Sequence, residues 1–214
     1  MVTMVKEGHV VHVGVSSLSA DVVRRMYELL KEQGLTLFSN QVEFSLLEVG
    51  CESSGLIAEC QRLGVKVFAC CPLGMGRLTG KYSAGRQPPW FAPGGGERGS
   101  SASTSLAAVT WGQIDDILDL AREIGERNGG RSAAQVALNW CIARGTLPIV
   151  GAKTAEQAEE NCGGFGWRMD DVDVERLSHL ARRIARERAN PPAGGKGKGR
   201  KGAAKGYRGR GRGF

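Results

Sequence analysis

The alternation of hydrophobic and polar positions predicts strands and helices in turn along most of the chain. Short runs rich in valine, isoleucine and phenylalanine suit buried strands, and stretches with an apolar residue every three or four positions suit amphipathic helices. We predict strands at residues 9–15, 35–43, 65–71 and 147–150. We predict helices at residues 20–33, 56–63, 105–128, 133–143 and 171–189, and a further helix that begins at Ala155.

The helix boundaries rest on local signals. Ser19 and Ser132 are suited to cap the helices that follow them, and Gly34 and Gly145 end helices. In the helix at 20–33 the predicted buried stripe is Val22, Val23, Met26, Leu29 and Leu30. In the helix at 105–128 it is Ile114, Ile117, Leu118, Ala121 and Ile124.

The repeated order of strand and helix favours an α/β fold with a parallel sheet and right-handed crossovers. A (β/α)₈ barrel needs eight strands and about 250 residues, so four strands in 214 residues supply half of such a barrel. We assign residues 1–190 to this half barrel and residues 83–104 to a flexible Pro/Gly/Ser-rich loop within it. Residues 191–214 form a Gly/Arg/Lys-rich tail that we expect to be disordered.

The segment from Leu147 to Asn161 carries the clearest chemical signal. A strand end, the turn at Gly151 and a helix start at Ala155 direct unpaired N–H groups toward one point, and Lys153 adds a positive charge. Thr154 and Gln157 have the spacing of a capping box. This pattern indicates a phosphate site, and an ordinary strand-to-helix turn with a solvated lysine explains it as well.

Other polar candidates follow the remaining predicted strands. They are Ser16 and Ser17 after the first strand, Asn40 and Gln41 after the second, and Cys71 with the loop at 73–81 after the third. Active sites of barrels lie at the carboxyl ends of the strands. We therefore expect these residues to line one shared mouth with the 151–161 segment.

Charge is distributed unevenly. The whole chain carries +7 and the last 24 residues carry +8, so residues 1–190 carry −1. The Gly-Arg repeats of the tail are typical of RNA-binding segments, with Arg200, Arg208, Arg210 and Arg212 as candidate contacts. Another acidic partner, or a solvated linker, is compatible with the same composition.

Cysteine usage and hydropathy narrow the cellular compartments in which we expect this protein. None of the 6 cysteines forms a CxxC pair and only 3 histidines are present, so no zinc spacing appears. We expect free thiols in a reducing compartment, either cytoplasmic or organellar, and not a secreted protein. No signal peptide is visible, and no segment approaches the roughly 20 apolar residues of a membrane span. Cys70 and Cys71, being neighbours in a strand, are expected to point to opposite faces.

The 147–161 segment resembles the Pro-x-x-Gly-x-(Lys/Arg)…Gln-x-x-Glu-Asn run of the aldo-keto reductase family, and the resemblance extends from about Glu7 to about Asp173. It implies an NADP(H)-binding domain and the C-terminal half of a (β/α)₈ barrel. By this similarity Lys153 and Thr154 would meet the 2′-phosphate, and the turn at Gly151 would belong to the same cofactor site. Adenine would be flanked by Gln157, Glu160 and Asn161.

Three further motifs resemble those of the family. Residues 14–17 resemble Gly-x-Ser-Asn, which implies that Ser16 and Ser17 bind the nicotinamide carboxamide, and Gln41 in Asn-Gln-Val-x-(Tyr/Phe)-(Ser/Asn) would hold its other side. Residues 68–74 resemble (Ile/Val)-Ala-Tyr-Ser-Pro-Leu-Gly, with Cys70 in place of the stacking tyrosine and Cys71 in place of the pyrophosphate-binding serine. The pyrophosphate loop would keep Leu73, Gly76 and Leu78. Because stacking is worth about 1 kcal/mol and a thiol is a weak donor, we expect weak NADP(H) binding.

The resemblance also implies that the catalytic Asp, Tyr, Lys and His of the family lie on strands that match positions before Glu7. We therefore expect this chain alone to be inactive in carbonyl reduction. The alternative is a non-catalytic interaction module with an RNA-binding or acidic-partner-binding tail. Since four strands leave two open sheet edges, we expect self-association, including two copies completing one barrel, or a partner that supplies the other half.

Overall fold

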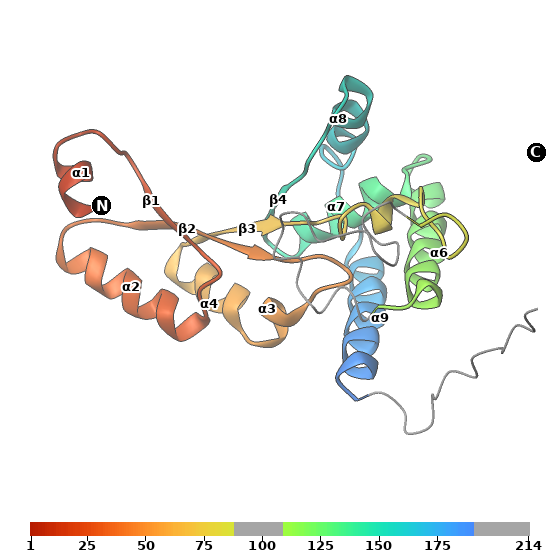
Figure 1. Ribbon diagram of the computed structural model, residues 1–214, viewed down its shortest axis with the longest axis horizontal. Coiled ribbons are helices and arrows are strands. Elements are labelled where there is room, and N and C mark those ends of the chain that lie inside the picture. Colours follow the sequence, from red (N-terminus) through yellow and green to blue (C-terminus); the bar gives the residue numbers. More distant parts are fainter. Residues whose placement is uncertain (88–108, 191–214) are drawn as a thin grey trace, which may run out of the picture.

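The computed structural model describes residues 1–87 and 109–190. Its centre is a parallel sheet in the order β1-β2-β3-β4 (Figure 1). The strands are β1 Val13–Ser16, β2 Leu37–Glu43, β3 Lys66–Cys70 and β4 Leu147–Ile149. The helices are α1 Val2–Lys6, α2 Ala20–Glu32, α3 Gly50–Ser53, α4 Leu56–Leu63, η1 Arg77–Thr79, α6 Trp111–Arg127, α7 Ala133–Ala143, α8 Ala155–Cys162 and α9 Asp171–Ala189. The predicted α/β class is confirmed.

Helix starts follow the capping chemistry of the sequence. Thr110 and Ser132 each form a complete capping box, with Gln113 and Gln135 returning the bond at α6 and α7. Asp170 accepts the backbone N–H of Asp173 at the start of α9. These caps satisfy N–H groups that would otherwise lack partners, so the three helices start at defined residues.

One face of the sheet is covered by helices. Helix α2 packs on β2, α4 on β3 and α7 on β4, and α2 and α4 lie along the same side of the strands in Figure 1. The core continues from the sheet into α6, α7 and α9. Its largest fully buried side chain is Trp140, which stacks on Phe44 at a centroid distance of 4.9 Å.

The opposite face of the sheet is open in the described part of the chain. Strand register aligns Ser16, Gln41, Phe68 and Leu147 in one row across the four strands. Ser16 and Gln41 are exposed, Leu147 is 47% exposed, and Ile149, two residues along β4, is 50% exposed. Apolar side chains on this face would be interior in a closed barrel, so the sheet has the arrangement of half a barrel.

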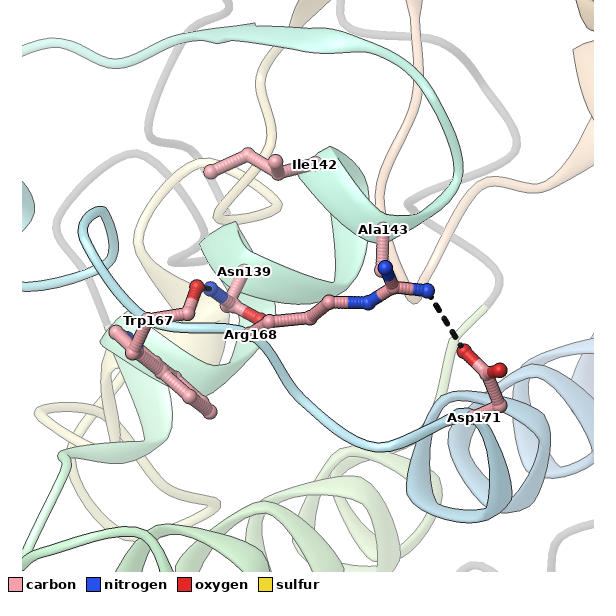
Figure 2. A pocket seen from close by; sticks show the side chains of 6 residues that line it. All are labelled: Asn139, Ile142, Ala143, Trp167, Arg168 and Asp171. Carbon is pink, nitrogen blue, oxygen red and sulfur yellow. Dashed lines mark hydrogen bonds and ion pairs between the residues drawn. The ribbon is translucent and has the colours of Figure 1, made fainter.

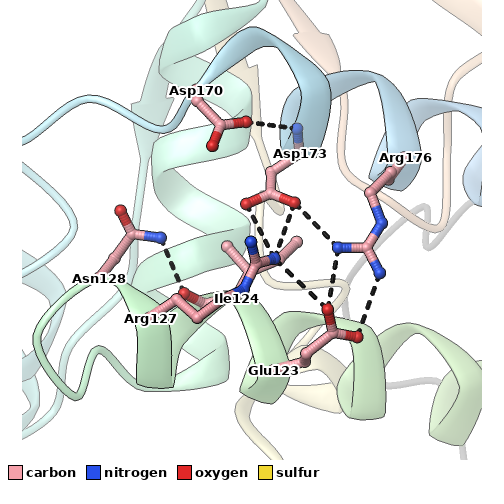
Figure 3. A network of polar contacts seen from close by, with 7 residues as sticks. All are labelled: Glu123, Ile124, Arg127, Asn128, Asp170, Asp173 and Arg176. Carbon is pink, nitrogen blue, oxygen red and sulfur yellow. Dashed lines mark hydrogen bonds and ion pairs between the residues drawn. The ribbon is translucent and has the colours of Figure 1, made fainter.

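A charged network joins α6 to α9. The carboxylate of Asp173 is 2% exposed and accepts hydrogen bonds from Arg127 at 2.9 and 3.1 Å and from Arg176 at 3.0 Å (Figure 3). Arg176 also donates to Glu123, which holds the pKa of that carboxyl below its usual range. Because a buried carboxylate needs its partners, this network fixes α9 against α6.

The first predicted strand begins too early. Residues 9–12 precede β1, and His12, read as a strand residue, instead stacks its ring on Phe38 at 4.5 Å and 11°. The register between β1 and β2 shifts at Val13/Gly14, so Phe38 is an extra residue on β2. The valine run was a misleading signal because β2 begins at Leu37, which pairs with Val13. The residues before Val13 therefore have no strand to pair with.

The predicted stripe of α2 is partly wrong. Val23 and Leu30 are buried, whereas Val22 and Leu29 are 44% and 48% exposed. Ser19 precedes the helix as predicted but makes no side-chain capping bond. The described chain packs only one side of α2 against the sheet and α4, so the wider apolar stripe is half covered.

The predicted loop at 83–104 and the helix at 105–128 fall partly outside the described residues. Within them, Ser83 pairs with Arg86 in a short antiparallel bridge, and Val109 and Thr110 precede α6 and are not helical. All five apolar residues predicted for that helix are buried. The tail at 191–214, with Arg200, Arg208, Arg210 and Arg212, lies outside the described residues.

Candidate functional site

A cavity of about 600 Å³ lies at the carboxyl ends of β3 and β4. Three segments build it: the loop that follows β3, the end of β4 with the turn after it, and the inner side of α8. Ala134 of α7 also lines the cavity. Its lining residues are Cys71, Pro72, Leu73, Met75, Gly76, Thr79, Lys81, Tyr82, Ala134, Ile149, Val150, Gly151, Gln157, Glu160 and Asn161.

The turn from β4 into α8 is held by its own side chains. Thr154 caps α8 by accepting the Gln157 N–H at 3.3 Å. The reciprocal bond of the predicted capping box is absent, because Gln157 Oε1 accepts the N–H of Lys153 at 2.8 Å instead. Asn161 donates to the carbonyl of Gly151 at 3.4 Å. These bonds fix the backbone and leave the Lys153 side chain exposed.

An acidic side chain already interacts with the N-terminal end of α8. Glu156 interacts with the Thr154 hydroxyl and with its own backbone N–H, and both contacts lower the pKa of the Glu156 carboxyl. A helix N-terminus favours negative charge. Both features favour an anionic oxygen at this turn.

Glu160 has a structural role that the sequence did not reveal. Ser132 Oγ donates to Glu160 Oε1, and Gln135 Nε2 donates to the Glu160 carbonyl at 3.0 Å and to its carboxylate at 3.3 Å. Ser132 and Gln135 are the capping pair of α7, so Glu160 ties α8 to the start of α7. A ligand that uses the Glu160 carboxylate must share it with these two donors.

Ser16, Ser17 and Gln41 meet at the open ends of β1 and β2. The Ser16 hydroxyl and the Ser17 N–H both donate to the Gln41 carbonyl, at 3.1 and 2.8 Å. Ser17 has φ +58, a left-handed conformation that Asn tolerates better than Ser. The structure thus brings these three residues together, and their contact with a nicotinamide stays a prediction.

The prediction that Cys70 and Cys71 point to opposite faces assumed that both lie in an extended strand, and this is wrong. The strand ends at Cys70, and Cys71 adopts φ +52. Leu73 lines the cavity, whereas Leu78 is 1% exposed and packs in the core. Any contact of Leu78 with a ligand would therefore use its backbone.

Half of the predicted site residues line the cavity. Those that line it are Cys71, Leu73, Gly76, Gly151, Gln157, Glu160 and Asn161; those that do not are Ser16, Ser17, Gln41, Cys70, Leu78, Lys153 and Thr154, so the expected single mouth is formed only in part. Thr79 and Lys81 line it too, within the predicted loop at 73–81 but not singled out as site residues. Tyr82, which directly follows that loop, also lines the cavity and was missed.

A second cavity, of about 400 Å³, lies between α7 and the segment that precedes α9 (Figure 2). The buried amide of Asn139 donates to the carbonyls of Gly164 and Trp167 and accepts from Met169 N–H. Arg168 pairs with Asp171 at 3.3 Å. The polar groups of this cavity therefore serve the fold.

Two other classes of site are absent from residues 1–87 and 109–190. No group of three or more His, Cys, Asp or Glu side chains there has the arrangement of a metal site. Among the helices of that same part, none combines the length and apolar character needed to cross a bilayer.

Comparison with known proteins shows the family of the chain. The model of the aldo/keto reductase family matches residues 1–182. The chain belongs to the aldo-keto reductase family. Pyridoxal reductase of Arabidopsis thaliana, named as chloroplastic, is 34% identical over 182 residues, which are 85% of this chain and 47% of the relative. L-glyceraldehyde 3-phosphate reductase of Escherichia coli K12 is 35% identical over 161 residues, 73% of this chain and 45% of the relative.

A solved member of the family shows the same fold. The thermostable aldo-keto reductase Tm1743, crystallised with the inhibitor epalrestat, superposes with a TM-score of 0.60 at 19% identity. The match covers 83% of this chain and 51% of the solved chain. This chain therefore spans about half the length of the relatives it matches, which confirms the predicted half of a (β/α)₈ barrel.

Proposed function

We propose that this chain binds NADP(H) in the cavity beside β3 and β4, as the cofactor-binding half of a carbonyl-reductase-like protein. The family generally uses NADP(H), and both relatives named above are reductases of aldehydes. The 2′-phosphate would meet Lys153, Thr154 and the N-terminal N–H groups of α8. The pyrophosphate would lie along the loop that includes Cys71, Leu73 and Gly76.

The observation that carries the proposal is the exposed Lys153 side chain at the N-terminus of α8, next to a cavity lined by Gly151, Gln157 and Asn161. Glu156 lies at the same turn, and hydrogen bonding to the Thr154 hydroxyl and to its own N–H lowers the pKa of its carboxyl. The side chain is exposed, so it can swing away at little cost. The cavity, the exposed ammonium of Lys153 and the helix N-terminus together fit an extended dinucleotide with a phosphate at its end.

Replacing Glu156 by Gln tests this arrangement. Because the substitution removes the competing negative charge, we expect NADPH to bind about two- to fivefold more tightly, which corresponds to a charge at a helix terminus. NADPH fluorescence titration measures the dissociation constant. NADH lacks the 2′-phosphate and should bind E156Q and wild type alike; equal tightening for both nucleotides, or no NADPH binding to either protein, would contradict the proposal.

The proposal concerns cofactor binding, and it assigns the role of proton donor to no residue of this chain. Reduction of an aldehyde needs an acid near the carbonyl oxygen, and general acid catalysis typically contributes 10²–10⁴-fold. The resemblance puts that acid on strands matching positions before Glu7. Turnover would therefore require those strands to cover the open face that carries Gln41 and Phe68. We do not propose turnover for the present chain by itself.

A second candidate function rests on the tail, which has eight Lys and Arg and no Asp or Glu between residues 191 and 214. We propose that it binds RNA. Replacing Arg200, Arg208, Arg210 and Arg212 by Ala in the full chain should lower the salt slope of oligo(U) binding by about 3, because each phosphate contact contributes about 0.7 for single strands. Fluorescence anisotropy at several salt concentrations measures it; unchanged affinity and slope would exclude the tail as the binding segment.

A further inference from the structure

The adjacent thiols of Cys70 and Cys71 have a chemistry of their own besides the positions that they occupy in the proposed cofactor site. Cys70 is half-buried and Cys71 is exposed, at the end of β3. Cys71 also lines the cavity. The two thiols belong to consecutive residues, and the left-handed conformation of Cys71 departs from the extended backbone that directs neighbouring side chains to opposite faces.

The backbone of this pair is fixed from both sides. The Cys70 carbonyl accepts the Phe44 N–H at 3.2 Å, and the Cys71 carbonyl accepts the Gly74 N–H at 2.8 Å. Two sulfur atoms on neighbouring, anchored residues lose little freedom when they bind one centre together. After the first sulfur bonds, the second acts at a high effective concentration.

The other described cysteines lack this arrangement. Cys60 and Cys141 are buried, and burial raises the pKa of the half-buried Cys51 to about 12. Cys162, on α8, is exposed and is not adjacent to another cysteine. It therefore serves as the matched single thiol for comparison with the pair.

We propose that Cys70 and Cys71 form a bidentate dithiol site for soft, thiophilic centres, of which a trivalent arsenical is the chemical class. An arsenoxide R–As=O reacts with both thiols to give two As–S bonds. The As=O oxygen leaves as water with the two thiol protons. Arsenic stays trivalent, so no oxidant or reductant is needed. Sulfur ligands prefer such soft centres.

Acid–base properties distinguish this site from a peroxide sensor. Burial raises the pKa of both thiols, and Glu43 nearby raises them further. Both groups are therefore protonated at neutral pH, whereas rapid oxidation requires a thiolate. Chelation gains its stability from two bonds formed together and tolerates a protonated starting state.

The test uses the full chain, phenylarsine oxide and an excess of glutathione, which removes singly bonded arsenic. Native mass spectrometry should show one arsenic adduct per chain that resists glutathione and is released by dithiothreitol. Cys70→Ser and Cys71→Ser should each weaken the glutathione-resistant adduct by on the order of 10²-fold, and Cys162→Ser should leave it unchanged. Circular dichroism confirms that each variant is folded.

Peptide mapping of the wild-type adduct gives a result that does not depend on any variant. Arsenic found on the peptide with Cys70 and Cys71 supports the site; arsenic on Cys51 or Cys162, or an adduct that glutathione displaces from the wild type, overturns it. The dithiol site does not rest on cofactor binding. An adduct that leaves NADPH affinity unchanged would count against the cavity as the cofactor site and would leave the dithiol site supported.

Discussion

Replacing Trp140 by Ala should lower the free energy of unfolding by about 3–5 kcal/mol, the usual range for removing a large buried aromatic side chain. Trp140 is 0% exposed and stacks on Phe44, which directly follows β2. Its Nε1–H donates to Ser178 Oγ at 2.9 Å, on α9. One side chain on α7 thus joins the end of the sheet to the last described helix.

A milder pair of substitutions separates packing from the hydrogen bond. Trp140→Phe keeps a ring against Phe44 but loses the indole donor, so we expect a loss of about 1–2 kcal/mol. Ser178→Ala removes the acceptor, although Ser178 Oγ also donates to the Val174 carbonyl at 2.7 Å. The double mutant should show coupling of about 0.5–1.5 kcal/mol.

Urea unfolding at a fixed protein concentration, followed by tryptophan fluorescence and circular dichroism, measures these values. The fixed concentration matters because an open sheet face favours association, and association changes apparent stability. Val172→Ala, at a side chain that is 70% exposed on α9, is the control and should change stability by less than about 0.5 kcal/mol. If Trp140→Ala lowers the free energy of unfolding by less than about 1 kcal/mol, the packing of α7 through Trp140 is not a main source of the core's stability.

Local rules predicted much of the fold because several helix signals here are strong. Ser132 caps α7 as predicted, with Gln135 returning the bond, and Asp170 caps α9 by accepting the Asp173 N–H. In a helix capped in this way, local hydrogen bonds set the first residue, so its start does not depend on a distant segment of the chain. Strand ends are different, since a strand exists only where a neighbour provides its hydrogen bonds, and the start of β1 could not be located without β2.

The candidate site was predicted in outline and not in its bonding. The sequence located the turn between β4 and α8, but it could not show that Gln157 would bond to Lys153 N–H or that Glu160 would be held by Ser132. The alternation rule placed Cys70 and Cys71 on opposite faces because it assumes an extended backbone. The left-handed conformation of Cys71 breaks that assumption.

Reversing the charge of Lys153 should give the largest effect on cofactor binding. Lys153→Glu would remove the proposed charged hydrogen bond to the 2′-phosphate, worth about 1.5–3 kcal/mol, and would add a repulsive charge at the same place. We expect NADPH affinity to fall by on the order of 10²-fold, since each 1.4 kcal/mol is about tenfold. Added salt should reduce the difference, because Lys153 is exposed and its charge is screened.

Two comparisons make the result specific to the phosphate. NADH affinity should change by less than about twofold in Lys153→Glu, because NADH places no phosphate at this turn. Lys66→Glu carries the same change of charge at the start of β3, the opposite end of that strand from the cavity, and should leave NADPH affinity unchanged. Equal losses for NADPH and NADH, or equal losses in the two variants, would mean that Lys153 acts through the overall charge of the protein and that the turn before α8 is not where the 2′-phosphate binds.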